Sequence, residues 1–485
     1  MRDTIPLVTP LAPTRREAGR LVLGALLGLA PAGCALRPDA IPAIERGPDR
    51  FREAEASAAW PDPNWWRGFG SVELDRLMRR IASENLDLAA ATARVRQAEA
   101  SARIAGSTLL PTVTTSGNAR RSQTGSGNPS ATAYDIGLAA SYELDVWGLN
   151  RNTYESARLS AVAARYALGT ALITAEASVA NTYFTILEAR NALRIQEANL
   201  GAARRVLNVI RQQVAAGTAT GLDLAQQETV VAQQEAAVPP LRQAVSQNVA
   251  TLAVLVGLAP VQLEVLGEGF EGLDVPSPSP GLPSALLARR PDVLQAEASL
   301  ASAGANTAAA RAALLPSIVL SAQGGFTSAL IGTLLRPEAQ FYTLAANLAQ
   351  TIFDNGGLRG RVELARAQQE ELVIIYRQTI LNALADVESA LAALRETTEQ
   401  ETLLAEAERR AARAYNIAEE QLRGGVINLI TLLSTQTTLF SARRNLSTGR
   451  RNRLQAAVGL FRALGGGWGA DAARAPSPAV LEVAR

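Results

Sequence analysis

A segment without glycine or proline, residues 361–423, is the feature that most limits how this chain can fold. Glycine and proline most often end or bend a helix, so their absence predicts one unbroken helix. At about 1.5 Å per residue, that helix is roughly 95 Å long. Its apolar residues are spaced three or four apart, at Val373, Tyr376, Ile380, Leu384, Val387, Leu391 and Leu394. This periodicity keeps one face against a neighbour and predicts a rod or helical barrel, with a soluble two-stranded coiled coil as the alternative.

The chain also contains an internal duplication of about 200 residues. Identical residues recur at one constant offset: Gly148, Arg151, Glu155, Arg158, Gly217, Leu224 and Gly257 match Gly356, Arg359, Glu363, Arg366, Gly425, Leu432 and Gly465. Chance identities would scatter over many offsets. Both halves therefore share one plan: a helix, two strands, a very long helix, a tight turn and a further helix.

The duplication predicts the domain boundaries. The first repeat covers residues 71–274 and the second 285–468, joined by the Pro/Ser-rich linker VPSPSPGLPS at 275–284. Strands are expected at about 111–121, 134–146, 316–326 and 340–353, and long helices at 150–214, 222–257, 358–423 and 428–464. The Ala/Pro-rich tail, residues 469–485, is expected to be disordered.

The four extended segments have the length and patterning of membrane strands. In YDIGLAASYELD, apolar residues alternate with polar or small ones, and about ten residues is the length that a tilted membrane strand needs. Four strands do not close a barrel, and open strand edges do not occur in lipid. Either the segments are soluble hairpins, or three copies share a barrel of twelve strands.

The N-terminus reads as a secretory signal over residues 1–33. Arg15, Arg16 and Arg20 precede the apolar run LVLGALLGLAPAG, which ends directly before Cys34. Small residues before a single cysteine resemble the lipobox of bacterial lipoproteins, although Pro31 stands where leucine is usual. The prediction is a lipidated Cys34 that begins a lipid-anchored segment over residues 34–70. An ordinary signal peptide with an incidental cysteine is the alternative.

The composition argues against an enzyme and against a nucleic-acid-binding protein. The chain has no histidine and only one cysteine, which removes imidazole acid–base catalysis, intramolecular disulfides and the usual zinc ligands. Its 47 basic and 45 acidic residues give no electrostatic footprint for nucleic acid. We expect no catalytic residues, no metal and no cofactor beyond the covalent lipid on Cys34, and an enzyme is the least favoured reading.

Four stretches resemble a known family. They are NWWRGFGSVELDRLM (64–78), GLPSALLARRPDVLQAEASL (281–300), GGVINLITLLSTQTTL (424–439) and LFRALGGGW (460–468). They are similar to the TolC-type outer membrane factors, in particular the NodT lipoprotein branch that serves resistance-nodulation-division (RND) efflux pumps. The resemblance implies a mixed, predominantly α fold: a homotrimer with a shared twelve-stranded outer-membrane β-barrel on a long periplasmic α-helical barrel.

The same resemblance implies the function and the partners. The chain would be a passive exit duct for small molecules, in contact with outer membrane lipid, a periplasmic adaptor protein and an RND inner-membrane pump. An outer membrane channel of a type I protein secretion system is the alternative within transport. A lipid-anchored envelope coiled coil without a pore is the alternative outside it. The sequence does not identify the exported substrate or the particular adaptor and pump.

Two glycine-containing turns are the candidate functional sites: the first turn, residues 215–224, and the second turn, residues 423–432. By analogy with the family, the predicted adaptor-docking residues are Gly217, Thr218, Gly221, Leu222, Asp223, Gly424, Gly425, Val426, Asn428 and Leu429. Ile427 and Asp223 are the predicted pore constriction, as a hydrophobic ring or an acidic one, since Ile427 and Ser434 stand where relatives often carry aspartate. Glu143, Asp145, Gln323 and Asn347 are expected to face the lumen or its rims.

Overall fold

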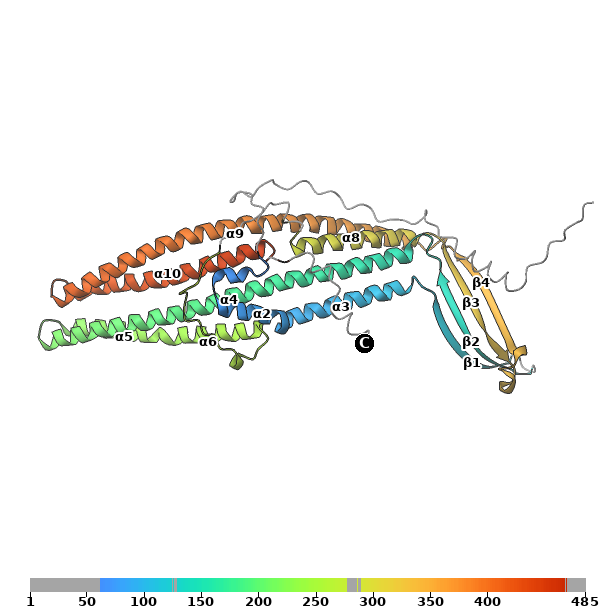
Figure 1. Ribbon diagram of the computed structural model, residues 1–485, viewed down its shortest axis with the longest axis horizontal. Coiled ribbons are helices and arrows are strands. Elements are labelled where there is room, and N and C mark those ends of the chain that lie inside the picture. Colours follow the sequence, from blue (N-terminus) through green and yellow to red (C-terminus); the bar gives the residue numbers. More distant parts are fainter. Residues whose placement is uncertain are drawn as a thin grey trace, which may run out of the picture. The chain divides into compact units, whose positions relative to one another are not determined.

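The computed structural model describes residues 62–123, 125, 129–276, 286, 289–466 and 468, which form two compact units (Figure 1). The sheet unit combines Arg103–Ser156 with Ala303–Ala367. The helical unit contains the other described residues. Both units therefore draw on both halves of the chain. The predicted signal peptide, Cys34, most of the linker and the tail from residue 469 lie outside the described residues.

The sheet unit is built on one antiparallel sheet with strand order β1-β2-β3-β4. Its strands are β1 (Thr112–Ser122), β2 (Ala131–Glu143), β3 (Ser317–Ser328) and β4 (Gln340–Ala349). Each half of the chain contributes one hairpin, and β2 pairs with β3 where the two halves meet. Among the described residues, β1 and β4 each have a neighbour on one side only, so the sheet has two open edges.

The register places the apolar side chains of all four strands on one face. Leu138 of β2 pairs with Gly324 of β3, which in turn pairs with Tyr342 of β4. Thr115 of β1 completes this row across the sheet. The face is uncovered in the protomer, because Leu138 is 59% and Tyr342 83% exposed. It is therefore an apolar surface that no described part of the chain covers.

Two strand boundaries differ from the predictions. The strand expected at 134–146 is β2, which begins and ends three residues earlier, because the carboxylate of Asp145 accepts the amides of Asn150 and Arg151 and caps the next helix. The strand expected at 340–353 ends at Ala349, since Asp354 accepts the amide of Leu358 and begins the following helix. In both cases the capping aspartate ends the extended segment.

Eight α-helices complete the described fold, several with residues in both units. They are α2 (Val72–Glu84), α3 (Leu86–Ser107), α4 (Leu149–Ala215), α5 (Gly221–Ala236), α6 (Val238–Leu255), α8 (Pro291–Ala312), α9 (Gly357–Arg423) and α10 (Leu429–Ala463). The two longest, α4 and α9, have 67 residues each and are thus about 100 Å long. No helix in the described part of the chain is both long and apolar enough for a membrane span.

One helix prediction is wrong. The segment 222–257, expected as one helix, is two helices that meet at Ala237. Pro239 and Pro240 lie in the first turn of α6, where their missing amide donors remove the bonds that would continue α5. The corresponding helix of the second half, α10, contains no proline and runs unbroken for 35 residues.

The main core of the helical unit forms where the N-terminal segment packs on α4 and α10. Trp65, Trp66 and Phe69 are all buried. The ring of Trp65 stacks on Phe461 of α10 with centroids 4.9 Å apart, and Phe69 contacts Phe184 of α4. These tryptophans are therefore packing residues of the helical unit.

Candidate functional site

The first turn is a tight connection between α4 and α5. Gly217 has a φ of 72°, in the left-handed region that an L side chain rarely adopts. The amide of Thr218 donates to the carbonyl of Gln213 at 2.9 Å, which closes the end of α4. Gly221 begins α5 with open space around it. The turn is thus an exposed loop with a defined hydrogen bond at the end of α4.

Asp223 is bound within the first turn. Its carboxylate accepts the backbone amide of Thr220 at 2.8 Å and the hydroxyl of the same residue at 2.7 Å, while its own amide donates back to that hydroxyl. This reciprocal capping box holds the start of α5. These hydrogen bonds from Thr220 lower the pKa of Asp223, so the carboxylate is charged at neutral pH.

The second turn repeats this geometry between α9 and α10. Gly425 has a φ of 71°, and the amide of Val426 donates to the carbonyl of Gln421 at 2.9 Å. Asn428 caps α10 by accepting the amide of Thr431 at 3.0 Å. An added side chain at Gly424 would meet only ordinary contacts. The two halves of the chain thus end their longest helices in the same way.

A shared apolar cluster holds the two helical hairpins together. Ile210 of α4 packs with Tyr415 of α9 and Leu432 of α10. Leu429 belongs to this cluster and is only 4% exposed, so its side chain helps to hold the hairpin, while its docking role stays a prediction. Ile427 also packs against this cluster and is half-buried. The sequence alone did not distinguish the buried side chains of the second turn from its exposed ones.

Apolar side chains project from both turns. Leu222 of the first turn is 68% exposed and Val426 of the second is 73% exposed. Ile430, which the sequence analysis missed, is also exposed and lines an open groove of about 740 Å³ between α9 and α10. Hydroxyl groups such as that of Ser434 line the same groove. Exposed apolar residues beside hydrogen-bonding groups are suited to binding another protein.

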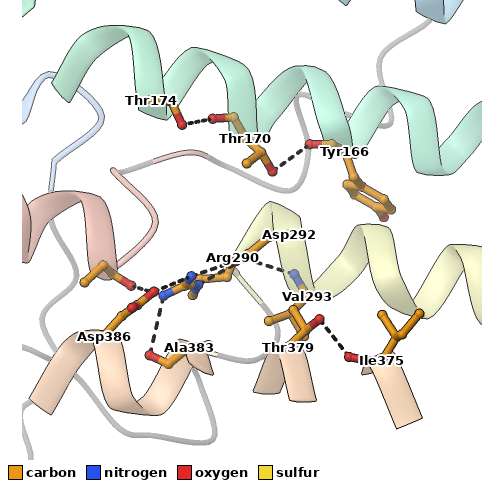
Figure 2. Close-up of polar contacts among 11 residues, drawn as sticks. Tyr166, Thr170, Thr174, Arg290, Asp292, Val293, Ile375, Thr379, Ala383 and Asp386 are labelled. Carbon is orange, nitrogen blue, oxygen red and sulfur yellow. Dashed lines mark hydrogen bonds and ion pairs between the residues drawn. The ribbon is translucent and has the colours of Figure 1, made fainter. Parts of the chain in front are cut away.

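A second polar site lies at the start of α8 and is shown in Figure 2. The guanidinium of Arg290, whose side chain is 10% exposed, donates two hydrogen bonds to Asp292 at 2.6 and 3.0 Å and one to Asp386 of α9 at 3.0 Å. It also donates to the carbonyl of Ala463 at the end of α10 at 3.1 Å. Burial lowers the pKa of Arg290, but its bonds to Asp292 and Asp386 raise it by more, so it stays charged. Arg290 therefore connects the start of α8 to α9 and to the end of α10, and we call this set of contacts the Arg290 lock.

A pocket of about 420 Å³ lies beside this lock and is lined by Thr170, Thr174, Ser389 and Arg462, among others. The hydroxyls of Thr170 and Thr174 are bonded to carbonyls of their own helix, as Figure 2 shows. The sequence analysis did not single out Arg290. The Arg–Pro–Asp run within residues 281–300 was the available signal, while the partners on α9 and α10 lie far along the chain.

The comparisons with known proteins identify the family. The model of the outer membrane efflux protein family matches residues 77–258 and 282–466. The chain belongs to the outer membrane efflux protein family. It is 40% identical over 429 residues to the pyoverdine export outer membrane protein OpmQ of Pseudomonas putida, covering 86% of this chain and 91% of that protein.

Other members of the outer membrane efflux protein family agree along most of their length. The probable efflux pump outer membrane protein TtgC of Pseudomonas putida is 32% identical over 476 residues, covering 93% of this chain and 96% of TtgC. The outer-membrane channel OprN has a solved structure that superposes with a TM-score of 0.84 at 25% identity, covering 90% of this chain and all of OprN. The TolC-type resemblance seen in the sequence is thereby confirmed.

This outer membrane efflux protein keeps polar groups on the other face of its sheet. Glu143, Val319 and Asn347 form one row across β2, β3 and β4, and Gln323 lies on the same face. Asp145, expected to face the lumen or its rims, lies just beyond the end of β2 and caps α4. Within the described residues, no group of three His, Cys, Asp or Glu side chains is arranged to hold a metal ion.

Proposed function

We propose that this protein is the outer membrane exit duct of a tripartite RND-type efflux pump, a passive channel that carries small molecules from the periplasm to the outside. The observation that carries the proposal is the four-stranded sheet with one apolar face and two open edges. Unpaired backbone groups are too costly in lipid for such a sheet to remain alone there.

The finer architecture that we propose is a trimer in which the open sheet edges of three copies pair with one another. β4 of one copy next to β1 of another gives a closed, twelve-stranded barrel, with the apolar face toward lipid and the row of Glu143 and Asn347 toward water. The long helices α4 and α9 of each copy would then form the periplasmic α-helical barrel. A covalent lipid on Cys34 would add a second membrane attachment.

The two turns are the proposed docking site for the periplasmic adaptor. Leu222 offers an exposed apolar side chain in the first turn and Val426 offers one in the second. A ring of six turns around the trimer axis would present these side chains to adaptor hairpins. The inner-membrane pump is the further partner that supplies the energy.

The proposed constriction is a ring of Ile427 near the second turn. Asp223 is the alternative, but its carboxylate is occupied by the cap on α5. An Ile427→Asp variant in planar bilayers should raise cation selectivity, because three carboxylates replace three apolar groups near the axis. Unchanged selectivity in that variant, together with a loss of selectivity in Asp223→Asn, would instead assign the constriction to the acidic ring.

The name of OpmQ suggests which cargo to assay first. This chain has 40% identity to that pyoverdine exporter and 32% to TtgC. Release of a pyoverdine-type compound should therefore fall when the gene is deleted in its host and recover when it is restored. Normal release with altered sensitivity to other compounds would assign a different cargo.

The direct test of the duct uses the full-length protein extracted in detergent. Light scattering should give the mass of three copies, and planar bilayers should show stepwise conductance. A monodisperse monomer that conducts no ions would overturn the proposal.

A further inference from the structure

We propose that Arg121 binds a phosphate group of an outer-leaflet lipid at the rim of the β-sheet. This inference rests on the proposed placement of the sheet in the outer membrane. Arg121 lies one row before the end of β1, close to the hairpin loop, and its register partner is Thr132 of β2. The helices leave the sheet at its opposite end, so the rim that contains Arg121 faces the outside.

The face on which Arg121 lies makes this residue unusual. Register partners point to the same side of a sheet, so Arg121 shares the apolar face with Ala119, Tyr134 and Ile136. All other positions of β1–β4 on this face are uncharged. A single cation on a lipid-facing surface is costly at the centre of the bilayer and tolerated at its boundary, where it reaches headgroups.

The position along the strand fits such a boundary. Arg121 is about 27 Å along the strand from Val113 on the same face, at roughly 3.4 Å per residue. With the usual tilt of barrel strands, this distance approaches the height of an apolar band of about 25 Å. The guanidinium therefore lies near the outer edge of that band, where lipid phosphates are found.

The local contacts leave most of the guanidinium free. Its Nε donates to the hydroxyl of Ser130 at 3.1 Å, and no described carboxylate lies within ion-pair distance. An exposed guanidinium presents a planar fork of donors that matches two oxygens of a phosphate. Arg120, one residue earlier, points to the opposite, polar face.

The loop between β3 and β4, at the same rim, supplies an independent observation. Leu330, Ile331 and Leu335 are each more than two-thirds exposed, and Arg336 follows directly with no described carboxylate in ion-pair distance. Large apolar side chains next to a cation are typical of segments that lie at a membrane surface. The rim thus combines apolar insertion with cations that can reach lipid phosphates.

The test measures binding of diphosphorylated lipid A to full-length trimers by native mass spectrometry, with lipid A lacking both phosphates as the comparison. The wild-type trimer should prefer the phosphorylated form by about tenfold. Arg121→Gln should lose most of this preference, and Arg121→Lys should keep part of it because the charge remains. Arg120→Gln, the matched control on the other face, should retain the wild-type preference.

Three results would overturn the inference: unchanged preference in Arg121→Gln, equal loss in Arg120→Gln, or complete displacement of the lipid by inorganic phosphate at about 10 mM, which would indicate a free-anion site. Conductance of the same preparations separates this inference from the proposed function. Conducting trimers without lipid preference refute only the lipid site, whereas protein that neither conducts nor forms trimers refutes the duct.

Discussion

The indole nitrogen of Trp65 donates a hydrogen bond to Oε2 of Glu176 at 3.4 Å, which links the N-terminal segment to the middle of α4. Glu176 is a buried carboxyl group, and no other hydrogen bond or ion pair in the described part of the chain offsets its burial. Burial raises the pKa of Glu176 to about 7, and the hydrogen bond from Trp65 lowers it only in part. We therefore expect the attachment of this segment to weaken as the pH rises toward 7.

Glu176→Gln should stabilise the protein above neutral pH. The folded pKa is raised, so the contribution of Glu176 to stability is complete below about pH 4.5 and is lost as the pH rises to about 7. Gln keeps an acceptor for Trp65 without the buried charge, and the gain at pH 8 should be about 3 kcal/mol. Melting temperatures of variant and wild type should coincide at pH 4.5 and diverge at pH 8. Equal differences at both values would contradict this assignment.

Arg290→Gln should destabilise the helical unit strongly. The substitution removes the cation shared by Asp292 and Asp386, whose side chains are 31% and 51% exposed, at a cost of about 1.5–3 kcal/mol. Arg204→Gln is the control, because it removes an exposed ion pair to Glu235 that contributes about 1 kcal/mol or less. Thermal unfolding of the two variants measures the difference, and similar losses would show that the lock does not hold the helices.

Gly425→Ala should loosen the second turn, because a φ of 71° costs an alanine about 1–2 kcal/mol. The neighbouring Gly424→Ala is the matched control, since it has ordinary contacts and no positive φ. In limited proteolysis, cleavage at the second turn should become faster only in the first variant. The first turn offers the same comparison between Gly217→Ala and Gly221→Ala.

Gly325→Ala should reduce the yield of folded trimers. Gly325 faces Gly137 across β2 and β3, and a Cβ there would come within 2.2 Å of the carbonyl oxygen of Ile136. Gly324→Ala, one position earlier, would meet its nearest atom at 3.6 Å and should be tolerated. The fraction of protein that migrates as trimer after extraction is the measurement. Equal yields would mean that the strands separate at no significant cost.

Leu222→Asp with Val426→Asp should weaken adaptor binding at least about tenfold, because charged groups replace exposed apolar contacts at the centre of the proposed interface. Val261→Asp introduces the same charge at another exposed site and should bind normally. Surface plasmon resonance with the adaptor as ligand measures the affinities. Normal binding by the double variant would exclude the turns as the docking site.

The long helices could be predicted from the sequence because the residues that begin and end them lie close to their ends in the chain. The helix expected at 358–423 is α9, which begins one residue earlier and ends at Arg423, before Gly424. The break at Ala237 was missed although Pro239 and Pro240 signal it, since the duplication suggested an unbroken helix like α10. Symmetry between halves was thus a weaker guide than local backbone chemistry.

The candidate functional sites could be predicted from the sequence only in part. Both turns follow from their glycines, but the sequence does not tell that Leu429 points into the core while Ile430 points outward, because both are apolar and adjacent. The partners of Arg290 lie on α9 and α10, far from it in the chain, so only the fold brings them together. Tertiary contacts of this kind leave no local pattern.

The open edges of β1 and β4 have a genetic consequence. In the proposed trimer every copy supplies part of the same wall, so a single copy with a damaged edge interrupts the whole ring. If a cell makes damaged and intact copies in equal amounts and they mix at random, only about one trimer in eight is free of damage. An allele with a broken edge should therefore be dominant over its normal counterpart.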